Sequence, residues 1–124
     1  MANPNIVAVT TINGGTSAAA LSTTNATSLV SNAASSSTIV KVNNLFVSNV
    51  NGVSAATITV SYNNAAAGAG TNYRMAYQIS VPANSTLMIL DKSGAIYLGE
   101  NSSLVVQAGT AGYLEVVASY EIIA

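Results

Sequence analysis

Hydrophobic and polar residues alternate along much of this chain with the period of two that is typical of β-strands. The alternation runs through segments 56–62, 73–81 and 114–122. β-branched residues and tyrosines fill their apolar positions, as a half-buried pleated surface favours. Each segment is predicted to be a strand with one face toward a core. The apolar positions are Ala56, Ile58, Val60 and Tyr62, then Tyr73, Met75, Tyr77, Ile79 and Val81, then Leu114, Val116, Ala118, Tyr120 and Ile122.

Three further stretches are apolar on both faces, at 39–50, 87–90 and 104–108. These stretches fit central strands, or strands covered once by the core and once by a neighbouring chain. Another strand is expected over Ile6–Ile12.

Turn signals separate these segments at short intervals. Asn51-Gly52 predicts a tight hairpin between strands at about 39–50 and 54–62. Residues 63–72 predict a loop tip of small residues, and residues 82–85 break a strand. Ser93-Gly94 and residues 109–112 are expected to close two more hairpins. Because no helical period intervenes, the chain is predicted to be all-β, a single antiparallel β-sandwich of jelly-roll or immunoglobulin-like type.

Residues 13–37 are dominated by Gly, Ala, Ser, Thr and Asn. This composition fits a flexible linker, or an extended N-terminal arm that becomes ordered against a neighbour. We favour the arm, and divide the chain into an N-terminal strand and arm over 1–37 and a β-sandwich domain over 38–124.

The low content of charged residues indicates a component of a protein assembly and not a free domain. The chain has three Lys or Arg and four Asp or Glu, so 6% of its residues are charged, whereas half are hydrophobic. Soluble domains carry about 25% charged residues. A surface of hydroxyl and amide groups suits a protein that packs against protein neighbours. Three basic residues are too few to neutralise a phosphate backbone, so no nucleic-acid partner is expected.

The composition provides few of the side chains that catalytic sites use. Without Cys or His, disulfides, thiolate or imidazole metal sites, and Ser-His-Asp triads are excluded. Glu115 and Glu121 share a predicted strand face but lie roughly 20 Å apart, beyond the about 5–9.5 Å of glycosidase carboxyl pairs. Asp91 and Glu100 could approach each other or a calcium ion, although solvated turn residues explain them better. We therefore predict no enzyme, and no catalytic, metal or cofactor-binding residues.

Two other motifs have simple explanations. Gly68-Ala69-Gly70 begins like a phosphate-binding loop, but it lacks the third glycine and a following helix, so a flexible hairpin tip is the better interpretation. No apolar run reaches the about 20 residues of a membrane helix, and Met1–Asn5 do not resemble a secretory signal. We expect synthesis in the cytoplasm and no membrane partner.

Four tyrosines are candidate contact residues. Tyr62, Tyr73 and Tyr77 lie on apolar faces of adjacent predicted strands. A cluster in the core or at the sheet rim is the simpler interpretation. The alternative is that Tyr62, Tyr73, Tyr77 and Tyr97 contact a neighbouring subunit, since aromatic residues anchor interfaces. Carbohydrate stacking on exposed Tyr73 or Tyr97 is a third possibility, although the chain has no tryptophan.

Four segments of the chain resemble small virion structural proteins of tailed bacteriophages, including marine and cyanobacterial ones. They are IVKVNNLFVSNVNG at 39–52, VPANSTL at 81–87, IYLGENS at 96–102 and VVASYE at 116–121. The resemblance implies a β-sandwich located in the virion, most simply as a capsid decoration (cement) protein. Such proteins bind the outer shell as trimers, so the implied partners are the major capsid protein or other virion proteins. A tail, neck or baseplate component, or a carbohydrate-binding module of a receptor-binding fibre, is the alternative.

Overall fold

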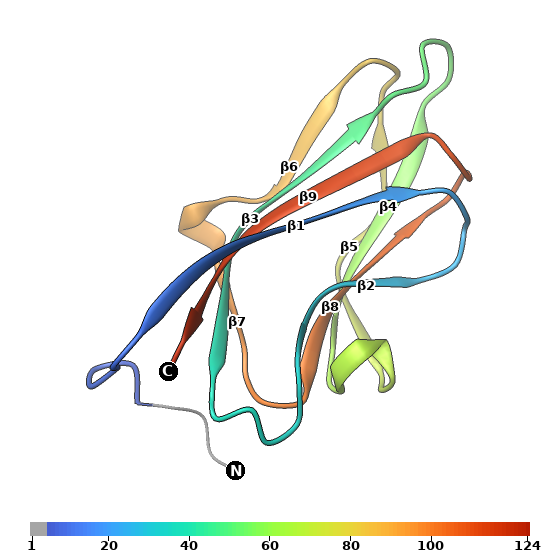
Figure 1. Cartoon of the computed structure of the whole chain (residues 1–124). Coiled ribbons are helices and arrows are strands. Elements are labelled where there is room, and N and C mark those ends of the chain that lie inside the picture. Colours follow the sequence, from blue (N-terminus) through green and yellow to red (C-terminus); the bar gives the residue numbers. More distant parts are fainter. Residues whose placement is uncertain (1–4) are drawn as a thin grey trace.

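The computed structural model describes residues 5–124, which form nine strands and two short 3-10 helices (Figure 1). The strands are β1 (Ile12–Leu21), β2 (Thr27–Asn32), β3 (Ile39–Asn49), β4 (Ala56–Asn63), β5 (Asn72–Val81), β6 (Thr86–Leu90), β7 (Ile96–Leu98), β8 (Ser102–Ala108) and β9 (Leu114–Ile123). The helices are η1 (Ala66–Gly68) and η2 (Lys92–Gly94). The predicted all-β sandwich is confirmed.

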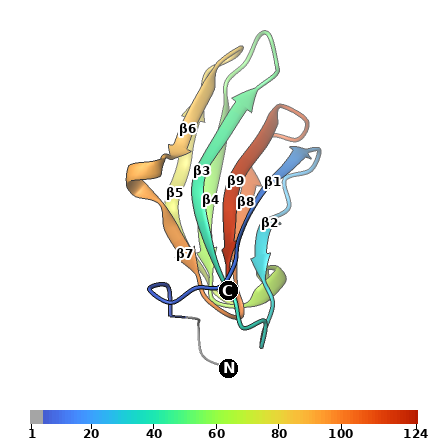
Figure 2. The same cartoon turned by 60° about the vertical axis from the view of Figure 1, so that its left-hand side comes forward.

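The strands form two antiparallel sheets that face each other. Sheet A has the order β1-β9-β3-β6, with β7 also paired to β3, and sheet B has the order β2-β8-β4-β5. Successive strands therefore cross from one sheet to the other, except at the β4–β5 hairpin and where β6 and β7 follow the same edge of β3 (Figure 2). Counting β6 and β7 as one interrupted strand gives the strand order of a jelly roll.

The core lies between the sheets. The largest side chains with no exposed surface come from both layers, and include Leu45, Val47, Ile58, Val60, Leu104 and Val116. Each contributes about 1.5–3 kcal/mol relative to an exposed position. The strands predicted over 39–50, 56–62, 73–81, 87–90, 104–108 and 114–122 all form, within a few residues of the expected ends.

The N-terminal part differs from the prediction. The strand expected over Ile6–Ile12 is wrong, because residues 5–11 form turns and bends and the strand begins at Ile12. Residues 13–37 do not project as an arm in this structure: β1 and β2 are edge strands of sheets A and B. Ser17 Oγ on β1 donates to the Leu29 carbonyl on β2 at 2.7 Å and joins the two layers. Whether 1–37 and 38–124 behave as separate units stays a prediction. Residues 1–4, which belong both to the predicted N-terminal unit and to the segment compared with a secretory signal, lie outside the described residues.

Packing against Tyr120 explains why β1 has a glycine at position 15. Gly15 pairs with Tyr120 on β9. A methyl group added at Gly15 would lie 2.7–2.8 Å from atoms of the Tyr120 ring and its hydroxyl. Because real Cβ atoms do not approach so closely, the tyrosine ring can lie across the edge strand only where a glycine stands.

Replacing Gly15 with Ala is expected to lower the free energy of unfolding by about 1–3 kcal/mol, since Tyr120 must leave its place against the core. Urea denaturation measures this change. Gly14→Ala is the control, because Gly14 has no neighbouring atom within 4 Å of the added methyl group. Equal stability of the two variants would contradict the packing role of Gly15.

Three predicted hairpin turns are wrong in their connections. Asn51-Gly52 joins β3 of sheet A to β4 of sheet B, and Asn51 Oδ1 accepts the Val53 and Ser54 N–H groups in place of a two-residue hairpin. Residues 109–112 join β8 to β9 in the other sheet. At Ser93-Gly94, η2 interrupts the β6–β7 edge. By contrast, residues 63–72 do join the paired strands β4 and β5, which confirms the hairpin tip at Gly68-Ala69-Gly70.

Asp91 holds the η2 interruption in place. Its Oδ1 accepts the Ser93 hydroxyl at 2.7 Å and the Ser93 and Gly94 N–H groups at 3.1 and 3.0 Å. The bond from the Ser93 side chain, followed by that from the Gly94 N–H, lowers the pKa of the Asp91 carboxyl below 3.8. This carboxylate is therefore used in a local turn.

Candidate functional site

The outer face of sheet A carries a line of apolar side chains that crosses four strands. Ala18 on β1 pairs with Val117 on β9, Val117 pairs with Phe46 on β3, and Phe46 pairs with Met88 on β6. Met88 is 49% exposed and Val117 is 38% exposed. We call Ala18, Val117, Phe46 and Met88 the apolar row.

Polar residues flank the apolar row. On one side, Ser48 and Thr86 share a hydrogen bond of 2.8 Å, and Glu115 pairs with Ser48. On the other side lie Ser119 and Asn44, joined by a bond from the Ser119 N–H to Asn44 Oδ1. A shallow groove of about 300 Å³ lies at the β1 end of the row, lined by Ala18, Ala20, Glu115 and Val117 among others. The row has the pattern of a contact surface, with an apolar centre and a polar rim.

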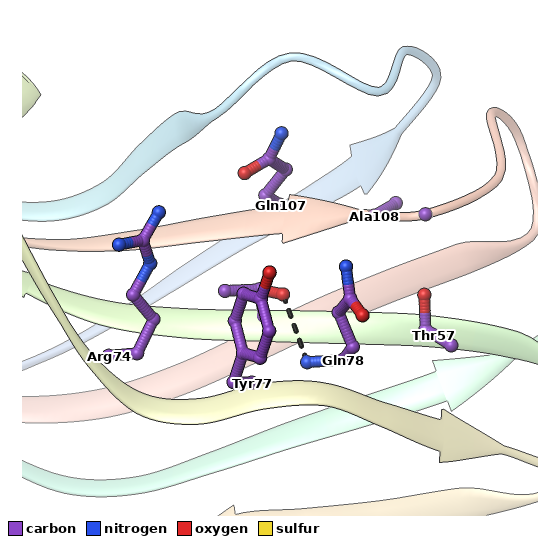
Figure 3. A pocket seen from close by; sticks show the side chains of 8 residues that line it. Thr57, Arg74, Tyr77, Gln78, Gln107 and Ala108 are labelled. Carbon is purple, nitrogen blue, oxygen red and sulfur yellow. Dashed lines mark hydrogen bonds between the residues drawn. The ribbon is translucent and has the colours of Figure 1, made fainter.

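The outer face of sheet B instead carries a polar depression of about 280 Å³ (Figure 3). We use the name polar depression for the surface lined by Thr57, Thr59, Arg74, Tyr77, Gln78 and Gln107, together with Ala108 and Gly109. Its residues come from the three adjacent strands β4, β5 and β8 and from the start of the β8–β9 loop. Gln107 Nε2 donates to the Thr24 carbonyl at 3.0 Å, which fixes one wall.

Irregular pairing of β5 shapes the polar depression. The register between β4 and β5 shifts between Ile58 and Val60 and again between Val60 and Ser61. Gln78 has a φ of 50°, which non-glycine residues rarely adopt. Its N–H donates to Thr59 Oγ1 at 3.1 Å, the bond drawn in Figure 3. The consecutive residues Tyr77 and Gln78 therefore both line this face, whereas in a regular strand they would point to opposite faces.

Arg74 lies beside Tyr77 in the polar depression. The guanidinium carbon lies 5.7 Å from the centre of the tyrosine ring, within the range of a cation–π contact. No carboxylate lines the depression. Its charge is therefore positive.

Three of the four candidate tyrosines lie on sheet B, where Tyr62 on β4 pairs with Tyr73 on β5. Tyr62 is half-buried and packs against the core. Tyr73 is 58% exposed and Tyr77 is 60% exposed, so they do not belong to the core. Both lie on the edge strand β5, which agrees with the other half of that interpretation, a position at the sheet rim. Tyr97 lies on β7 opposite Lys41, on sheet A. Contact of Tyr62, Tyr73, Tyr77 and Tyr97 with a neighbouring subunit stays a prediction.

Asp91 precedes η2 and Glu100 lies between β7 and β8, whereas Glu115 and Glu121 share β9 and are six residues apart. Asn43 Nδ2 donates to Glu121 at 3.2 Å, and Glu100 accepts the Ser37 N–H at 2.6 Å. Within residues 5–124, no group of three or more acidic residues is placed to hold a metal ion. No helix in the same part of the chain is long and apolar enough to cross a membrane.

The apolar row and the Arg74 contact were missed by the sequence analysis. One signal was present: Val117 interrupts the polar positions of the 114–122 alternation, and an apolar residue there must face away from the core. Nothing local to residues 74–78 revealed the bulges, because they depend on pairing with β4.

Known structures share this fold at very low sequence identity. One match comes from the capsid of the Helicobacter pylori bacteriophage KHP30, with a TM-score of 0.55, 8% identity, and coverage of 94% of this chain and 90% of that chain. Another comes from the disulfide-linked pili of Bacillus endospore appendages, with a TM-score of 0.53, 9% identity, and coverage of 92% and 87%. No protein-family profile and no curated protein sequence matches the chain significantly. The matches establish a fold that is also found in a viral capsid.

Proposed function

We propose that this chain is a non-enzymatic structural protein of a virus particle, and that it acts as a capsid decoration (cement) protein. It would bind the outer surface of the shell as a trimer, with the major capsid protein as its partner. The observation that carries the proposal is the fold shared with a chain of the KHP30 capsid structure, over 94% of this chain and 90% of that chain.

Two features of this chain support the proposal. First, 6% charged residues leave little electrostatic repulsion to keep free copies apart. Second, the apolar row lies on the outer face of sheet A, where a neighbouring protein would cover it. An exposed apolar patch on a soluble protein marks a contact site more often than a free surface. The KHP30 and appendage matches both come from large protein assemblies.

Binding to shells tests this function. Purified protein is added to capsids that lack it, and bound protein is measured by co-sedimentation together with the melting temperature of the shell. We expect saturable binding and a higher melting temperature, because a ligand of the assembled state stabilises that state by mass action. Electron microscopy of virions should then place the protein on the shell. Location on the tail, or shells that melt alike with and without the protein, would contradict the decoration role.

A further inference from the structure

We propose that the polar depression on sheet B binds a sugar residue that carries a carboxylate group. This proposal goes beyond the structural role and does not depend on it, since the site belongs to one copy of the chain.

The site is built at the expense of regular strand geometry. Two register shifts in β5 and the positive φ of Gln78 bring Arg74, Tyr77 and Gln78 onto one face. A non-glycine residue with positive φ costs energy and persists only where its surroundings hold it, and such residues gather at functional sites. Here Thr59 Oγ1 holds Gln78 through its N–H. The outcome is a concave surface in place of a flat edge strand.

The lining matches a ligand with many hydroxyl groups. Thr57, Thr59 and Tyr77 bring hydroxyls, which both donate and accept, and Gln78 and Gln107 bring amides, which do the same. A sugar ring presents donors and acceptors in similar number, so such a lining can satisfy it. The volume of about 280 Å³ is close to the lower limit of small-molecule sites. One sugar ring therefore suits the space better than a longer chain.

Arg74 selects for a carboxylate on that sugar. The guanidinium carbon lies 5.7 Å from the centre of the Tyr77 ring, so a planar, permanently charged group with five N–H donors stands beside a tyrosine at this site. Within residues 5–124 the guanidinium has no ion pair or hydrogen bond, and no acidic residue lines the depression. Planar guanidinium groups bind carboxylates through two parallel hydrogen bonds. An acidic side chain of a neighbouring protein would use Arg74 but would leave the Thr57 and Tyr77 hydroxyls and the Gln78 amide with no partner from the ligand, so the sugar is favoured.

Titration of the ¹⁵N-labelled full chain tests the site. The probes are sodium glucuronate, glucose, and N-acetylglutamate as a carboxylate without a sugar ring. We expect glucuronate to shift the side-chain signals of Arg74, Gln78 and Gln107 saturably, with an affinity at least about tenfold higher than either other probe. Equal shifts with glucose would overturn the role of the carboxylate. Equal shifts with N-acetylglutamate would overturn the sugar and point to an acidic peptide.

Variants on one strand complete the test. Arg74→Gln and Tyr77→Ala are each expected to weaken glucuronate binding about tenfold or more. Tyr73→Ala should leave it unchanged, because Tyr73 is as exposed as Tyr77 on the same strand but does not line the depression. The backbone amide signals of β3 and β9 report whether each variant keeps its fold. Unchanged binding by folded Arg74→Gln, or equal weakening by Tyr73→Ala, would overturn the proposed site.

Discussion

Replacing Asn63 with Asp is expected to lower the free energy of unfolding by about 3–5 kcal/mol at pH 7. Asn63 ends β4 and its side chain has no exposed surface. Its Nδ2 donates to the Gly70 carbonyl at 3.2 Å and to Asn72 Oδ1 at 2.7 Å. Aspartate would place a charged oxygen against these two acceptors, without a nearby cation to balance it.

The size of this loss should depend on pH. The Ala65 and Gly70 N–H groups that donate to Asn63 Oδ1 would act to lower the pKa of the introduced carboxyl. We expect complete burial and the two facing acceptors to outweigh them and to raise this pKa above its unfolded value of about 3.9. The folded variant then holds its proton more tightly than the unfolded chain, so its stability falls as the pH rises above about 4. Urea denaturation at pH 4 and pH 7 measures the difference between the variant and the parent chain, which should be smaller at pH 4.

Asn64→Asp is a matched control for this prediction. Asn64 is exposed and uses its Oδ1 to accept the Thr71 N–H at 2.8 Å, a bond that a carboxylate keeps. A change below about 0.5 kcal/mol is expected. If both variants lose the same stability, the added charge in the loop, and not the loss of the Asn63 amide, is responsible.

The same arrangement recurs at the ends of two other strands. Asn32 ends β2, and its Nδ2 donates to the carbonyls of Thr38 and Leu98 at 2.9 and 3.0 Å. Asn49 ends β3, and its Nδ2 donates to the carbonyls of Ser54 and Val81 at 3.0 and 2.9 Å. Each buried side-chain amide donates hydrogen bonds to backbone carbonyls in loops or at strand ends, where regular sheet pairing stops. Much of the asparagine in this weakly charged chain therefore has a structural role.

The sequence was informative about strands and less so about their neighbours. Alternation at 56–62 and 114–122 reflects burial on one face, which is a local property, and both strands form as predicted. The turn at Asn51-Gly52 was read as a hairpin because the dipeptide favours tight turns, yet in a jelly roll the chain crosses between sheets there. The sequence did not predict β1 as a strand, because its small residues carry no strand signal of their own. Gly15 is explained only by its packing against Tyr120, which lies far away in sequence.

The candidate sites show the same limit. The exposure of Tyr73 and Tyr77 follows from the edge position and bulges of β5, which only the partner strand reveals. The apolar row joins four residues that are distant in sequence and adjacent only through sheet pairing. The low charge predicted that a neighbouring protein covers part of the surface. The position of that part could be found only from the register of strand pairing in sheet A.

Replacing Val117 with Lys is expected to weaken binding to capsids by about 100-fold or more. Val117 stands between Ala18 and Phe46 in the apolar row. Residues central to an interface cost 2 kcal/mol or more when removed, and an unpaired ammonium group buried there costs further. Each 1.4 kcal/mol is a factor of about ten in affinity. Co-sedimentation with capsids over a range of protein concentrations measures the change.

The fold of this variant should remain intact, since Val117 faces away from the core and a substitution on an exposed strand position alters stability by about 1 kcal/mol or less. Val53→Lys is the matched control, because Val53 is 89% exposed in the β3–β4 loop and lies outside the apolar row. Its binding should equal that of the parent chain. If Val53→Lys loses binding while Val117→Lys keeps it, the loop end of the sandwich contacts the shell. The apolar row would then need another explanation, because a surface that tolerates a lysine at its centre is not buried in the assembly.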